Sequence, residues 1–213
     1  MELRRFDYPV RYLPARVPNQ ALDITGTIDA WDRHGSFPGD SMLADLRLGS
    51  FRNINVEGSP YSATAPTIPH WHPLFESSIE DGIREIVLHL VKVKSWITYT
   101  SCEGHNYGSE GPPPAMRHVG ILPRSNDEFG QVHRYLQTVV ADCQTLNDAG
   151  AVSLALILHP LRDSIRSVNV IDFIFAPGKT AGWPAYFSDL DEASRTVLDA
   201  MRTGPNRELV SND

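Results

Sequence analysis

After residue 74 the apolar residues switch between two spacings, and this switching constrains the fold more than any other feature of the chain. A stripe at three- and four-residue spacing predicts a helix of about five turns. Its members are Phe75, Ile79, Ile83, Ile86, Val87 and Leu90. A second stripe follows Ser125, whose spacing to Glu128 is that of a capping box, and a third follows Ser188. Four runs between these stripes have the alternation or the β-branched and aromatic content of strands: 95–101, 118–123, 152–159 and 168–175.

The predicted order of elements from residue 74 is therefore α-β-β-α-β-β-α. Consecutive strands with short connections pair antiparallel. Helices on one face of such a sheet form a two-layer α+β sandwich, whereas a doubly wound sheet needs regular alternation of strands and helices. We predict an α+β domain with a mostly antiparallel sheet over residues 74–204, followed by a frayed tail at 205–213.

The N-terminal third of the chain has no comparable periodicity. Residues 1–73 carry eight prolines and only short, broken apolar runs. Short strands are predicted at Ala21–Ala30 and Ser50–Val56. We expect residues 1–73 to form an irregular, Pro-rich extension that packs on the main body rather than a second domain.

Net charge, apolar content and cysteine number argue against several classes of function. The formal net charge is −7, so the chain lacks the diffuse attraction that binding to nucleic acid or an anionic membrane requires. No apolar run approaches the roughly 20 residues of a membrane span. Two cysteines do not make the disulfide framework of a small secreted domain, and the first residues do not form a signal peptide. We expect a cytoplasmic protein with a small-molecule ligand, and leave its oligomeric state open.

The segment Thr100–His105, T-S-C-E-G-H, concentrates groups that can do chemistry. A hydroxyl, a thiol, a carboxylate and an imidazole fall on Ser101, Cys102, Glu103 and His105. They lie where a predicted strand enters a loop that is rich in glycine and proline, an arrangement that often presents reactive groups. Gly104 allows the backbone to turn with positive φ or to approach a ligand closely.

Several uses of this segment remain open from the sequence. Cys102 is a candidate nucleophile if His105, His118 or an arginine lowers the pKa of its thiol, with Glu103 as a candidate general base. Cys102 and His105 are also candidate metal ligands, but a lone C-x-x-H is half of a zinc site and needs completion. The candidates for completing it are His118, His70 and His72. A turn with a purely structural role is a further reading.

The segment Arg117–Arg124 is expected beside the cysteine. If the strands at 95–101 and 118–123 pair antiparallel, Arg117 and His118 lie at the same end of the pair as Cys102. Arg117 and Arg124 are candidate partners for a substrate phosphate or carboxylate, together with the backbone at Ser101 and Gly104. Asp172 interrupts an apolar strand face, so its carboxylate needs a hydrogen-bond or charge partner. That partner can be a residue of the candidate site.

The T-S-C-E-G-H string resembles the short S-S-C-S-G-[RH] motif at a strand end in wybutosine-synthesis proteins. Thr100 and Glu103 stand at the two positions that depart from that motif. The resemblance covers six residues, and neither methyl transfer nor tRNA binding is carried over from it.

The leading hypothesis is a small intracellular enzyme that acts on a small polar, anionic substrate. Cys102 and His105 would carry the reactive roles, His118 would assist proton transfer, and Arg117 or Arg124 would hold the substrate. The alternatives are a non-catalytic binding or assembly module and a metal-binding protein that uses Cys102, His105 and other histidines. The sequence leaves the reaction, the cofactor and the metal unknown.

Overall fold

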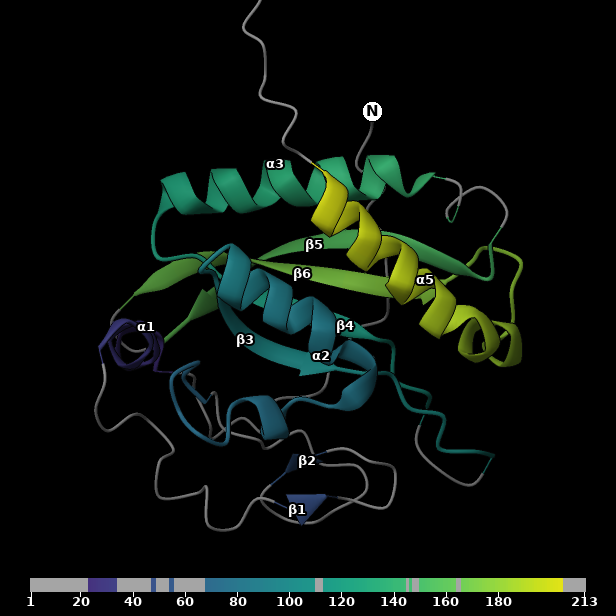
Figure 1. Ribbon diagram of the computed structural model, residues 1–213, viewed down its shortest axis with the longest axis horizontal. Coiled ribbons are helices and arrows are strands. Elements are labelled where there is room, and N and C mark those ends of the chain that lie inside the picture. Colours follow the sequence, from purple (N-terminus) through teal and green to yellow (C-terminus); the bar gives the residue numbers. More distant parts are fainter. Residues whose placement is uncertain are drawn as a thin grey trace, which may run out of the picture.

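The computed structural model describes residues 23–33, 47–48, 54–55, 68–109, 113–144, 146, 150–163 and 166–204 (Figure 1). Its centre is a sheet in the order β3-β4-β6-β5, in which every neighbouring pair is antiparallel. The strands are β3 (Ile97–Cys102), β4 (His118–Leu122), β5 (Val152–Arg162) and β6 (Ser167–Pro177). The antiparallel pairing predicted for consecutive strands is confirmed for β5 and β6, and both strands are longer than predicted.

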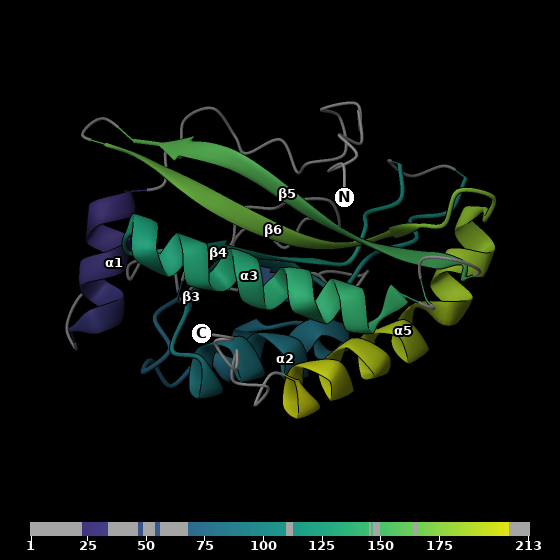
Figure 2. The same cartoon turned by 90° about the horizontal axis from the view of Figure 1, so that it is seen from above.

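Three helices cover one face of this sheet (Figure 2). They are α2 (Asp81–Leu88), α3 (Asn126–Asp142) and α5 (Trp183–Thr203). The predicted two-layer α+β class and the order α-β-β-α-β-β-α are therefore confirmed for the main body. None of the helices in the described part of the chain is long and apolar enough to cross a membrane.

The core lies between the sheet and the helices because alternate residues of each strand point to the helical layer. On the sheet side, Val119, Ile121, Phe173 and Phe175 are fully buried. These side chains belong to one continuous cluster with apolar residues of all three helices. Burial of this kind is the main favourable contribution to folding.

The first predicted helix is broken in two, and the break matters for the site. A short turn, η3 (Glu76–Ser78), is followed by two residues with extended backbone, Ile79 and Glu80. The helix α2 then begins at Asp81 and continues as one π-helical segment, η4 (His89–Val93). The apolar spacing runs across the break, so it could not reveal that Glu80 occupies an N-cap position.

Two other helix predictions need correction. The helix α5 begins at Trp183, not at Ser188, because Pro184 in its first turn is preorganised for a helix start. The segment Ala21–Ala30, predicted as a strand, is mostly helix α1 (Ile24–Asp32). The Asp23 carboxylate caps this helix by accepting from the Gly26 N–H at 2.8 Å.

Helix α1 and residues 68–73 pack on each other, and α1 contacts the main body. The Trp71 indole donates to the Ala30 carbonyl at 2.7 Å, and the Trp31 ring meets the Phe75 ring edge-on. The strand predicted at Ser50–Val56 overlaps β2 (Ile54–Asn55), which pairs with β1 (Arg47–Leu48). The remainder of that strand and of the extension, and the tail at 205–213, lie outside the described residues.

A bulge in β3 changes the predicted alternation of its side chains. The pairing with β4 shifts between Thr98 and Thr100, and the Tyr99 hydroxyl donates to Asp172 at 2.6 Å. The Tyr99 ring passes so close to Gly120 that a Cβ there would lie 2.6 Å from Tyr99 Cε1. His159 lies 3.0 Å from the other Asp172 oxygen, so the buried carboxylate that the sequence singled out is fully partnered.

One buried histidine makes stability depend on pH. Burial, with further contributions from Lys94 and Arg202, lowers the pKa of His89 below its ordinary 6.5, and its Nε2 lies 3.1 Å from the Tyr135 hydroxyl. As pH falls below 6.5, the unfolded chain takes up a proton that the folded protein resists, so stability is lost in acid. We expect the urea midpoint of the wild-type protein to fall more between pH 7.5 and pH 5 than that of His89→Gln. Equal pH dependence in the two proteins would contradict this role.

Candidate functional site

The site lies at the carboxyl end of the edge strand β3. Cys102 is the last residue of this strand and pairs with His118, the first residue of β4. Arg117 directly precedes it, so the expectation that Arg117 and His118 lie at the same end of the strand pair as Cys102 is confirmed. The chain leaves the sheet here, and α2 begins beside it (Figure 1).

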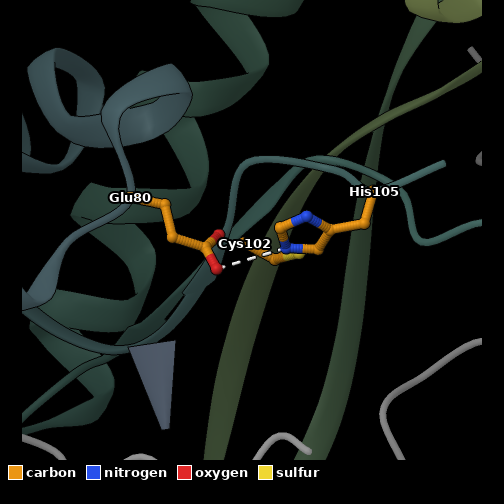
Figure 3. A group of neighbouring side chains, drawn as sticks. All are labelled: Glu80, Cys102 and His105. Carbon is orange, nitrogen blue, oxygen red and sulfur yellow. Dashed lines mark hydrogen bonds and ion pairs between the residues drawn. The ribbon is translucent and has the colours of Figure 1, made fainter. Parts of the chain in front are cut away.

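Three side chains meet at this point: Glu80, Cys102 and His105 (Figure 3). One oxygen, nitrogen or sulfur atom from each lies within 4.8 Å of the others. Glu80 Oε1 is 3.2 Å from His105 Nε2, and these two side chains are 10% and 5% exposed. We call Glu80, Cys102 and His105 the donor cluster.

Short-range backbone contacts hold His105 in the cluster. Its N–H donates to the Ala115 carbonyl at 3.0 Å, and the Ala115 N–H donates back to the His105 carbonyl at 2.9 Å. Gly104 has φ +86°, and a Cβ on it would lie 3.1 Å from Arg117 N, so this tight turn requires glycine. The Gly104 N–H also points to Cys102 Sγ at 3.4 Å.

The donor cluster holds a proton tightly. Burial opposes the charged imidazolium, but hydrogen bonding to Cys102 and Glu80 outweighs it and raises the pKa of His105 to about 10. Burial raises the pKa of the Cys102 thiol, against the opposing effect of His105, and the Glu80 carboxylate raises it further. At neutral pH His105 is therefore an imidazolium and Cys102 a thiol.

Glu103 and Glu80 exchange hydrogen bonds between side chain and backbone. The Glu103 N–H donates to Glu80 Oε2 at 2.7 Å. The Glu103 carboxylate accepts from the Gly82 N–H, in the first turn of α2, at 2.8 Å. Glu103, expected as a candidate general base, therefore has its carboxylate engaged at the start of a helix.

Arg117 lies inside the protein instead of facing a ligand. It is 4% exposed, and its guanidinium donates to the Glu103 carbonyl at 2.7 Å and to Ser194 Oγ at 2.6 Å. It also donates to the Leu190 carbonyl and pairs with Asp191 at 2.9 Å. These contacts join the loop after β3 to α5 and leave the guanidinium little capacity for a substrate.

The structure does not bring the other expected partners into the donor cluster. Arg124 lies beyond the opposite end of β4, where it pairs with Asp32 and Glu128. His118 is adjacent to Cys102 in the sheet, but its Nδ1 lies 3.2 Å from the Met116 carbonyl oxygen. His72 accepts from the Leu74 N–H, and the His70 ring lies 5.2 Å from that of Trp31.

Glu80 is the member of the donor cluster that the sequence did not reveal. It is 22 positions before Cys102, within a predicted helix, and no local motif joins the two. The only local signal is an acidic residue near a helix start, which is common for reasons of the helix dipole alone. The antiparallel sheet and the packing of α2 against it create the cluster.

Comparisons with known proteins supply no relative. No protein-family model matches the chain, and no curated protein or solved structure matches it either. The short resemblance to wybutosine-synthesis proteins therefore has no support from a family model, and the function has to be argued from the donor cluster.

Proposed function

We propose that this chain is a metal-dependent enzyme in which Glu80, Cys102 and His105 bind a single divalent ion of the zinc type. The observation that carries the proposal is the convergence of a carboxylate oxygen, a thiol sulfur and an imidazole nitrogen within 4.8 Å of one another. Zinc sites use these three kinds of ligand, and catalytic zinc sites commonly have three protein ligands with one position open to water.

The orientation of the His105 ring distinguishes this reading from a catalytic triad. In a triad, the imidazole lies between its partners, with one nitrogen toward the nucleophile and the other toward the carboxylate. Here Nε2 is the atom that Glu80 approaches, and one ring nitrogen lies within 4.8 Å of both a Glu80 oxygen and the Cys102 sulfur (Figure 3). Donors that face a common centre are the arrangement expected of metal ligands.

The spacing also fits one ion. Oxygen and nitrogen atoms bound to the same tetrahedral zinc lie about 3.3 Å apart, given metal–ligand distances of about 2.0 Å. The separation of Glu80 Oε1 and His105 Nε2 is 3.2 Å. A thiolate and an imidazole favour zinc and similar transition metals over Mg²⁺ or Ca²⁺, which prefer oxygen ligands.

The proposed reaction is hydrolysis of a small polar substrate. Zinc lowers the pKa of a bound water to about 7, so that hydroxide is available at neutral pH. An ion held by Glu80, Cys102 and His105 would supply an activated water for attack on an electrophilic carbon or phosphorus, and a proton of that water would pass to the leaving group as its bond breaks. Arg117 is buried among its own partners, so it is not the group that we expect to bind such a substrate. The free Cys102 and Cys143 thiols fit a reducing compartment such as the cytoplasm.

The test is metal content combined with thiol protection. Protein purified without a His-tag is expected to bind one equivalent of Zn²⁺, and bound Zn²⁺ is expected to slow alkylation of Cys102 by iodoacetamide. Cys143→Ala removes the other thiol, which is 1% exposed, and should leave both results unchanged. Absence of stoichiometric binding, with equal alkylation rates with and without Zn²⁺, would contradict the proposal.

A second candidate function is thiol-based catalysis, favoured by the coupling of Cys102 to His105. In that case Cys102 attacks as a thiolate that the His105 imidazolium stabilises. A panel of ester, amide and phosphate substrates separates the two functions. Turnover that survives removal of metal by a chelator, but not Cys102→Ser, would favour the thiol mechanism over the metal-dependent one.

A further inference from the structure

Glu80 is the N-cap residue of α2, yet its side chain does not cap that helix. One of its oxygens faces His105 at 3.2 Å and the other accepts from the Glu103 N–H at 2.7 Å. The Glu103 carboxylate takes over the cap by accepting from the Gly82 N–H at 2.8 Å. Glu103, and not Glu80, therefore caps α2, and the Glu80 carboxylate is available to the donor cluster.

Each polar group of Glu103 has a partner in this arrangement. Its N–H holds Glu80, its carboxylate holds the start of α2, and its carbonyl accepts from Arg117 Nε at 2.7 Å. Gly82 permits the close approach, since a Cβ there would lie 2.5 Å from the Arg117 guanidinium and 3.0 Å from Glu103 Cβ. The Glu80 carboxylate is thus held at both oxygens, one facing His105 and the other accepting from the Glu103 N–H.

We infer that Glu103 is a positioning residue for the metal site. It fixes the rotation of the Glu80 carboxylate so that Oε1 faces the ion. This inference rests on the proposed function. Residues that orient metal ligands from outside are worth about 10–100-fold in metal affinity in well-studied sites. Glu103 contributes through its backbone N–H and through the cap that keeps that N–H in place.

The experiment is a Co²⁺ titration of three variants, followed by absorption spectroscopy. In Glu103→Ala the cap is lost, and we expect Co²⁺ affinity to fall about 10–100-fold, with a change in the visible Co²⁺ spectrum. Glu103→Gln keeps an oxygen that can accept from the Gly82 N–H, and should retain affinity close to wild type. Ser125→Ala is the matched control, because it removes the N-cap of α3, whose Ser125 Oγ accepts from the Glu128 N–H at 3.1 Å.

The possible outcomes separate the positioning role of Glu103 from the proposed metal site itself. If Glu103→Ala and Ser125→Ala lose stability to similar extents and only Glu103→Ala loses Co²⁺ affinity, the inference is supported. Wild-type affinity and an unchanged spectrum in Glu103→Ala would overturn the positioning role alone, as would an equal loss of affinity in Ser125→Ala. If the wild-type protein binds no Co²⁺, the proposed function is overturned and this inference falls with it.

Discussion

Replacement of His105 by alanine is expected to lower Zn²⁺ affinity by more than about a hundredfold, since loss of an outer partner alone lowers it by up to that factor. The variant removes one of three donors and the group that faces Glu80 at 3.2 Å. The Glu80 carboxylate, which is 10% exposed, is then left with the Glu103 N–H as its remaining described partner. Hydrolytic turnover, if present, should fall with the affinity. The measurement is competition for Zn²⁺ against a chromophoric chelator.

His118→Ala is the matched control for this prediction. His118 is the residue directly paired with Cys102 in the sheet, but its ring contacts the Met116 carbonyl and it is not in the donor cluster. We expect its affinity for Zn²⁺ to stay within a few-fold of wild type. Equal losses in the two variants would show that the cluster residues are not the ligands.

Replacement of Arg117 by methionine is expected to destabilise the protein by about 2–4 kcal/mol, because hydrogen bonds from a charged group are worth about 1.5–3 kcal/mol each when buried partners are left unsatisfied. The Glu103 carbonyl and the Ser194 hydroxyl would lose their donor, whereas Asp191 is 82% exposed and can be solvated. For a chain of this size the melting temperature should fall by roughly 5–15 °C. Thermal and urea unfolding followed by circular dichroism measure the effect.

Arg124→Met provides the comparison at the other end of the same strand. Arg124 makes two ion pairs, but its side chain is 28% exposed, and ion pairs near the surface contribute about 1 kcal/mol or less. We expect a loss of no more than about 1 kcal/mol from this variant. If Arg117→Met were as stable as wild type and bound substrate weakly, the result would favour a substrate-holding role for Arg117.

Much of the fold follows from local patterns in the chain. Apolar spacing identified the three main helices and the four strands of the sheet, because burial of one face imposes a period on each element. The same reasoning missed the break before α2, because the apolar spacing continues across Glu80. It also misplaced the start of α5, which is marked by Pro184 and not by a polar cap. The segment at Ala21–Ala30 was too short for its period to distinguish a strand from helix α1.

The T-S-C-E-G-H segment was visible in the sequence as a concentration of reactive groups, and antiparallel pairing placed His118 beside Cys102. Only the tertiary structure decided what surrounds these groups. It brings Glu80 to Cys102 and His105, and it buries Arg117 in contacts with α5 more than 70 positions away in the chain. Local periodicity carries no information about such contacts, because they arise when separate elements pack and their buried polar groups must find partners.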